Sequence, residues 1–175
     1  AWQPGGYSAL GVYNAANQWR MLILFLPGRI GEVAMPMMTS LLGTNHISKF
    51  RRLFKMNLLF SCLLALGSAI IISLAGSYIM GLYGKEFTEG YWILVVLVMT
   101  GVVQVVVINF SNALVSLNRF WLNTISGLIW GLALLGLSWY LIPGHKALGL
   151  AFAGLFAYLF QSIFNGMMVI SGNRK

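Results

Sequence analysis

Long uncharged stretches alternate with short polar segments along this chain of 175 residues. No Asp, Glu, Lys or Arg occurs in residues 56–84, 91–118, 120–145 or 147–173. A transmembrane helix needs about 20 apolar residues to cross a hydrocarbon core about 30 Å thick, and each stretch is longer than that. The pattern predicts an all-α, polytopic bundle of transmembrane helices and not a soluble enzyme.

The first apolar segment, residues 7–42, is too long for one straight span and contains Pro27 and Pro36. Because proline removes a backbone donor and kinks a helix, we predict one long, bent helix that ends near Gly43. Residues 49–55 follow a polar turn, and four of the seven are basic. This pattern predicts a short amphipathic segment at the membrane surface. Residues 1–175 then form a single membrane domain with five spans, at about 7–42, 56–79, 91–117, 120–142 and 147–170.

The composition agrees, with 59% hydrophobic and 8% charged residues; a soluble domain has about a quarter charged residues. The net charge of +8 does not indicate nucleic acid, because the basic residues sit in short runs between spans and form no basic face. A single cysteine, Cys62, forbids an intrachain disulfide, and His46 and His145 lie in different loops. We therefore expect no metal site, no cofactor, no catalytic residues and no enzymatic activity.

Lys and Arg also set the orientation, because they are enriched in cytoplasmic loops. Alternation of five spans places seven basic residues on one side: Lys49, Arg51, Arg52, Lys55, Arg119, Arg174 and Lys175. Lys85 and Lys146 fall on the other side. This bias predicts a cytoplasmic C-terminus and an outside N-terminus for this segment.

An ionisable side chain within a span is a functional-site hypothesis by default, because its burial in hydrocarbon costs about 2.5–3.5 kcal/mol. At 100° per residue, Tyr13, Asn14, Asn17 and Arg20 fall on one face of the first helix. This face could border a cavity for an anionic, hydroxyl-rich ligand, since Arg suits phosphate. Alternatively, the Arg20 side chain could extend to the membrane–water interface or pair with another helix.

Three further groups are candidates. Arg29 and Glu32 are three residues apart and could form a structural ion pair, or Glu32 could bind a coupling ion. In the third span, the polar residues Thr100, Gln104 and Ser111 share a face that could be a second cavity wall or could make interhelical hydrogen bonds. Gly127 and Gly131 form a GxxxG pattern, which predicts close helix packing inside the bundle.

Three stretches resemble the polysaccharide and oligosaccharide flippases of the MATE/MOP transporter superfamily, the Wzx-like, O-antigen type exporters. Residues 9–16 (ALGVYNAA), followed by Pro27 and Pro36, are similar to the family's G-x-Y-x-x-A opening and its helix with two prolines. Residues 82–87 (LYGKEF) look like its YGxxF turn, and residues 141–149 (LIPGHKALG) resemble its IP-x-x-G-x-x-G turn. His145-Lys146 departs from the aromatic and Gly usual there.

The resemblance implies that this chain is most of the C-terminal six-helix lobe, from its second helix to its sixth, with the N-terminal lobe missing. It further implies transport of undecaprenyl-diphosphate-linked oligosaccharide across the bacterial inner membrane, with Arg20 and then Arg29 as candidate head-group ligands. Membrane lipids and glycan-assembly enzymes are the other expected partners. The alternatives are a MATE-like drug or cation antiporter, a membrane-embedded glycan polymerase or ligase, and a structural subunit.

Overall fold

The computed structural model describes residues 6–172, and every regular element within them is helical. In chain order these are α1 (Gly6–Gly43), α2 (Ile47–Leu74), α3 (Gly76–Leu82), the 3-10 helix η1 (Lys85–Gly90), α4 (Tyr91–Ser116) and α5 (Phe120–Gly172). Within this described range, four helices are long and apolar enough to cross a membrane. The chain is therefore an all-α, multi-pass membrane protein, as the hydrophobic pattern predicts.

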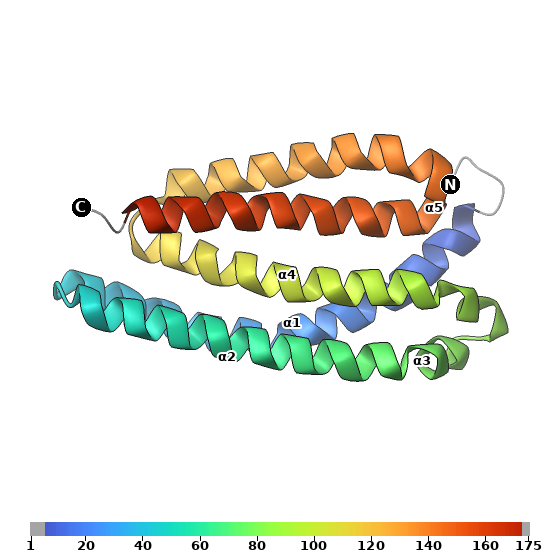
Figure 1. The fold of residues 1–175 in the computed structure, drawn as a ribbon, viewed down its shortest axis with the longest axis horizontal. Coiled ribbons are helices and arrows are strands. Elements are labelled where there is room, and N and C mark those ends of the chain that lie inside the picture. The colour runs from blue at the N-terminus through green and yellow to red at the C-terminus, as the bar shows by residue number, and fades with distance from the viewer. Residues whose placement is uncertain (1–5, 173–175) are drawn as a thin grey trace.

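Helix α5 is folded back on itself, so it supplies two of the membrane-crossing segments (Figure 1). The reversal lies at Lys146, whose φ of 49° and ψ of −126° are not helical. We call residues 120–145 the first arm and residues 147–172 the second arm. Gly149 lies so close to the backbone of Leu141 that a Cβ atom there would be 2.7 Å from the Leu141 carbonyl carbon. The predicted turn at residues 143–146, and with it the count of five segments, is confirmed.

The first two helices compare differently with the prediction. Helix α1 continues through Pro27 and Pro36 to Gly43, as expected. The basic residues 49–55, however, are not a separate surface segment, because they form the first turns of α2, which starts at Ile47. No Gly or Pro interrupts residues 47–66, so the helix continues directly into the apolar stretch. It then ends at Leu74, short of the predicted residue 79, and α3 begins at Gly76.

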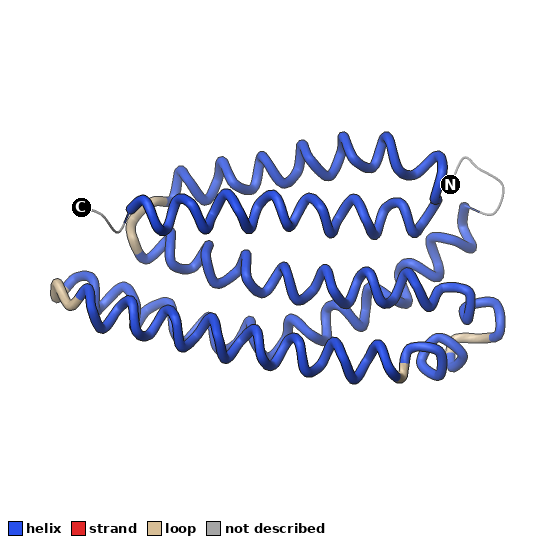
Figure 2. The backbone as a smooth tube through the Cα atoms, viewed as in Figure 1, coloured by secondary structure: helices blue, strands red, loops and turns tan. Residues whose placement is uncertain are grey.

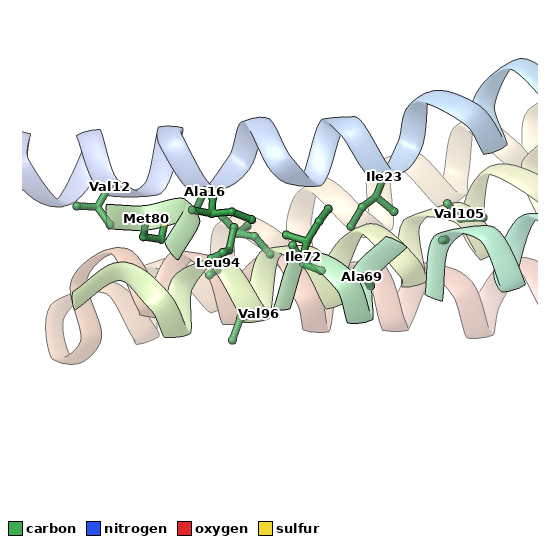
Figure 3. Packing of buried hydrophobic residues seen from close by; sticks show 14 residues of the cluster. Val12, Ala16, Ile23, Ala69, Ile72, Met80, Leu94, Val96 and Val105 are labelled. Atoms are coloured by element: carbon green, nitrogen blue, oxygen red, sulfur yellow. The ribbon is translucent and has the colours of Figure 1, made fainter. Parts of the chain in front are cut away.

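Helix α4 is the centre of the bundle. It packs against α1 and α2 on one side and against the arms of α5 on the other (Figure 1). The connections between helices are short (Figure 2). Figure 3 shows the main core cluster, in which Val12 and Ala16 of α1 lie near Met80 of α3 and Leu94 of α4. The cluster also contains residues of α2 and α5, so it holds α4 against α1, α2, α3 and α5.

The two ends of the bundle differ in charge. The α1–α2 turn with the basic residues 49–55 lies at the same end as the α4–α5 turn with Arg119 (Figure 1). Lys85 of η1 and Lys146 of α5 lie at the opposite end. The predicted segregation of basic residues is therefore confirmed for these positions. Arg174 and Lys175 lie outside the described residues.

The predicted packing of the GxxxG residues inside the bundle is wrong for this chain. A Cβ atom added to Gly127 or to Gly131 would meet nothing within 4 Å. Both glycines lie in the first arm, which is the outermost segment on its side of the bundle (Figure 1). The spacing of small residues permits another helix to approach closely but does not determine which helix does so. No described helix packs closely against Gly127 and Gly131.

Candidate functional site

Arg20 lies near the middle of the bundle. Its aliphatic stem crosses Gly101 of α4, where an added Cβ atom would be 3.2 Å from the Arg20 Cγ atom. Gly101 is 10 residues after Tyr91 and 15 residues before Ser116, or about 15 Å and 22 Å from the two ends of α4 at 1.5 Å per residue. The glycine at this position leaves the room that the Arg20 stem occupies.

The side chain of Arg20 lies beside the phenol of Tyr158, on the second arm of α5. Tyr13, on the same helix as Arg20, lies nearby. Arg20 itself is half-buried, and Tyr158 is 11 residues after Ala147, near the middle of the second arm, so the cation does not lie at a helix end. It links α1, α4 and α5 at mid-height.

A polar hollow of about 330 Å³ adjoins Tyr158, between α4 and the two arms of α5. Its polar lining comes from three segments: Gln104, Ser111 and Asn112 of α4, Trp130 of the first arm, and Tyr158 and Gln161 of the second arm. The rings of Trp130 and Tyr158 lie with their centroids 5.2 Å apart. Ligand sites are typically clefts of about 300–1,000 Å³ with a few placed polar groups, and the volume of this hollow is at the lower end of that range.

Two residues that line the polar hollow carry buried polar atoms with no hydrogen-bond partner among the described residues. They are Gln104 Oε1 and Trp130 Nε1, and Arg20 Nε, beside Tyr158, is also unpaired. Buried polar groups are almost always paired with protein, ligand or ordered water, and each unpaired group in hydrocarbon costs several kcal/mol. The region therefore has a capacity for hydrogen bonding that its own side chains do not use.

The residues predicted for the site are only partly brought together. Gln104 and Ser111 line the polar hollow, and Tyr13 lies near Arg20. Asn17 is half-buried, whereas Asn14 is exposed on the outside of α1. Thr100 is fully buried and donates to the Val96 carbonyl oxygen at 2.7 Å, which ties it to its own helix.

Arg29 and Glu32 lie elsewhere. The predicted ion pair is confirmed, since Arg29 Nη1 is 2.9 Å from Glu32 Oε2 and both side chains are about two-thirds exposed (64% and 65%). The guanidinium also lies over the ring of Phe25, 5.5 Å from its centroid. Arg29 lines a groove between α1 and α2 and does not line the polar hollow. The structure therefore separates Arg29 from Arg20, and a coupling role of Glu32 stays a prediction.

The sequence reasoning missed the contribution of the second arm. Tyr158, Gln161 and Asn165 are three and four residues apart and therefore share one helix face. Gln161 is only 8% exposed, and Asn165 is fully buried and donates to Ser111 Oγ at 3.3 Å. Their helical spacing in an otherwise apolar run was the available signal.

A second buried polar contact lies between α2 and α4. Asn57 Nδ2 donates to Asn109 Oδ1 at 2.6 Å, and Asn109 Nδ2 donates to the Val105 carbonyl oxygen at 2.9 Å. Both amides are more than nine-tenths buried. Interhelical hydrogen bonds of this kind join transmembrane helices, so this pair fixes α2 against α4.

Comparison with known proteins adds no further constraint, because the chain matches no family model, no curated protein and no solved structure. Within residues 6–172, no three His, Cys, Asp or Glu side chains lie close enough to hold a metal ion. The chemistry of the candidate site therefore rests on one cation, several amides and hydroxyls, and two aromatic rings.

Proposed function

We propose that this chain is a segment of a membrane transporter that moves a lipid-linked oligosaccharide across the bacterial inner membrane for surface polysaccharide synthesis. The observation that carries the proposal is the position of Arg20, whose cation lies at mid-height of an apolar bundle and next to the polar hollow. An arginine at such depth is costly and marks a functional site by default. The resemblance described above supplies the substrate class.

The available groups suit the two parts of such a substrate. The guanidinium is permanently charged and presents a fork of donors that matches phosphate oxygens, so Arg20 would hold the diphosphate. Side-chain amides both donate and accept hydrogen bonds, so Gln104, Asn112 and Gln161 would bind sugar hydroxyls. The unpartnered Oε1 of Gln104 is an acceptor suited to a hydroxyl.

An anionic substrate fits better than a cationic one. The described lining of the polar hollow contains no Asp or Glu. Glu32, the acid within a span, is paired with Arg29 on another face of α1. An exporter of cationic drugs would be expected to place a carboxylate at its binding site, since a buried cation needs an opposite charge. The charge distribution therefore disfavours the antiporter alternative.

The proposal is tested by binding. The purified chain is titrated with a short polyprenyl diphosphate that carries one sugar, and binding is followed by native mass spectrometry. Hydrogen bonds to charged groups contribute about 1.5–3 kcal/mol, so we expect Arg20→Ala to weaken binding by roughly tenfold or more. Arg29→Ala removes the same charge outside the polar hollow and is the matched control.

The two variants separate a specific site from general charge attraction. If Arg20→Ala and Arg29→Ala weaken binding equally, the diphosphate is not held at Arg20 and the proposed site is wrong. The same result follows if the uncharged polyprenol sugar binds as tightly as the diphosphate. A substrate held through Arg20 requires that the diphosphate bind more tightly and that only Arg20→Ala remove this advantage.

A further inference from the structure

A second cavity lies on the opposite side of the bundle, between α1 and α2. It is a groove of about 520 Å³, and its walls are formed chiefly by Ile30, Val33 and Met37 of α1 and by Leu53, Met56 and Phe60 of α2. We call it the lateral groove. Val33 is 65% exposed and Met56 is 59% exposed, so the groove is open along the outer surface of α1 and α2. Its walls are almost entirely apolar.

Basic side chains border the end of the lateral groove nearest the α1–α2 turn. Lys49, Leu53, Met56 and Phe60 are separated by four, three and four residues, which places them in one stripe along α2. Lys49 is therefore one turn beyond the wall residue Leu53, towards the turn. Arg52 lies one turn from Met56 at the edge of the same stripe. Both cations are exposed.

Among residues 6–172, no acidic side chain neutralises Lys49 or Arg52 at this end. The carboxylate of Glu32 is bonded to Arg29, and Glu86 and Glu89 lie in η1, at the opposite end of the bundle (Figure 1). Lys49 and Arg52 therefore add positive charge where the apolar groove opens. The combination of an apolar channel and a cationic mouth matches a molecule with a long hydrocarbon chain and an anionic head.

The floor of the lateral groove is fixed. Asn57 belongs to its lining and is 7% exposed. Its amide donates to Asn109 of α4 at 2.6 Å, so this part of α2 is tied to the central helix. A preformed cavity binds more tightly than one that must be ordered on binding.

We propose that the lateral groove binds one acyl chain of an anionic phospholipid whose phosphate is held by Lys49 and Arg52. The lipid lies against the outer surface of α1 and α2, with its head at the basic end of the bundle and its chain along Leu53, Met56 and Phe60. This site is independent of the polar hollow. It would anchor the protein in the leaflet that is rich in anionic lipid.

The test measures lipid retention. The chain is placed in nanodiscs of equal parts phosphatidylglycerol and phosphatidylcholine, released in the mass spectrometer, and scored for the lipid that remains bound. Each Lys or Arg near an anionic surface contributes about fivefold to binding. We expect the wild-type chain to retain phosphatidylglycerol preferentially and the Lys49→Ala/Arg52→Ala variant to lose roughly 30-fold of that preference. Val33→Trp, which fills the groove, should lower retention of both lipids.

Two matched controls make the result decisive. Lys85→Ala/Lys146→Ala removes the same charge at the opposite end and is the control for Lys49→Ala/Arg52→Ala. Ile71→Trp introduces a tryptophan on α2 outside the groove, where Ile71 is 69% exposed, and is the control for Val33→Trp. Both should behave as wild type. Equal retention of the two lipids by the wild type overturns the proposal. So does a loss in either control that matches the loss in its groove variant, because the binding is then general attraction and not the lateral groove.

Discussion

Helix α4 and the first arm of α5 have similar lengths and are both strongly apolar, yet they occupy opposite situations. Helix α4 is central, and Leu94, Leu97 and Leu114 on it are almost fully buried. In the first arm, Leu132 is 71% exposed and Trp139 is 87% exposed. Hydrophobicity alone therefore does not decide which segment is buried.

Polar and small residues account for the difference. Between helices in a membrane there is no hydrophobic driving force, because lipid tails are as apolar as leucine, and association depends on close packing and interhelical hydrogen bonds. Helix α4 supplies both, since Gly101 admits the stem of Arg20 and Asn109 bonds to Asn57. The glycines of the first arm meet no neighbour. In this chain, the segment that is buried is the one whose small residues and hydrogen-bonding side chains let other helices pack against it.

The largest expected contrast between the two segments is in their access to water. In a Cys62→Ala background, Gln104→Cys places a thiol in the polar hollow on α4, and Leu132→Cys places one on the lipid-facing side of the first arm. The two lie at similar depth, 13 residues after Tyr91 and 12 after Phe120. Because the thiolate is the reactive form and an apolar site suppresses charged forms by several pKa units, we expect a water-soluble maleimide to label position 104 about 100-fold faster.

Equal labelling rates at positions 104 and 132 would contradict the expected difference in access to water. They would mean that the polar residues of α4 face a dry interface, and the proposed binding of a polar head group beside Arg20 would be wrong. Ala113→Cys is a useful third position, because Ala113 is fully buried in the second core cluster and should stay unlabelled. A fast rate there would indicate that the bundle opens as a whole.

Glycine substitution tests the packing difference. We expect Gly101→Leu to lower the free energy of unfolding by about 1–3 kcal/mol, the usual range for overpacking, because Arg20 already occupies the space beside Gly101. Gly131→Leu in the first arm meets open space and should raise stability slightly, since leucine is the better helix former by up to about 1 kcal/mol. Denaturant unfolding in bicelles measures both. A first arm that lost as much stability as α4 would contradict its peripheral placement.

The fold was largely predictable because charged residues are rare and, apart from Arg20, Arg29 and Glu32 of α1, lie at or near the ends of the apolar stretches. The connections around Asn45, Gly84, Asn118 and Lys146 each contain a residue with positive φ, and each lies in a polar break between apolar stretches. The start of α2 was mispredicted because basic residues favour an interface, while nothing in the sequence stops the helix there. Where a helix begins relative to the membrane surface depends on the position of that surface, and the order of apolar and basic residues does not determine this position.

The candidate site was predictable on one helix at a time. Arg20 and Gln104 stand out because polar residues interrupt apolar runs, and the structure places both beside the second arm. A helical wheel gives the direction of a side chain within its own helix and not the neighbour that it meets. The Tyr158 face was overlooked for this reason. Arg29 was a second head-group candidate because the resemblance assigns the arginine by helix and not by residue, and Arg29 lies in the lateral groove.

The smallest expected effect concerns the polar contact that holds α4 to α2. A double-mutant cycle of Asn57→Leu and Asn109→Leu should give a coupling energy of about 0.6 kcal/mol, with about 1.7 kcal/mol as the upper value for such bonds in membranes. Each single variant leaves a buried amide without its partner, so the double variant should be more stable than the sum of the single changes predicts. Asn123→Leu in the first arm, which is half-buried, is the control and should not couple to Asn57→Leu. A coupling energy near zero for the Asn57–Asn109 pair would mean that small residues alone account for the central position of α4 and that this hydrogen bond does not contribute to it.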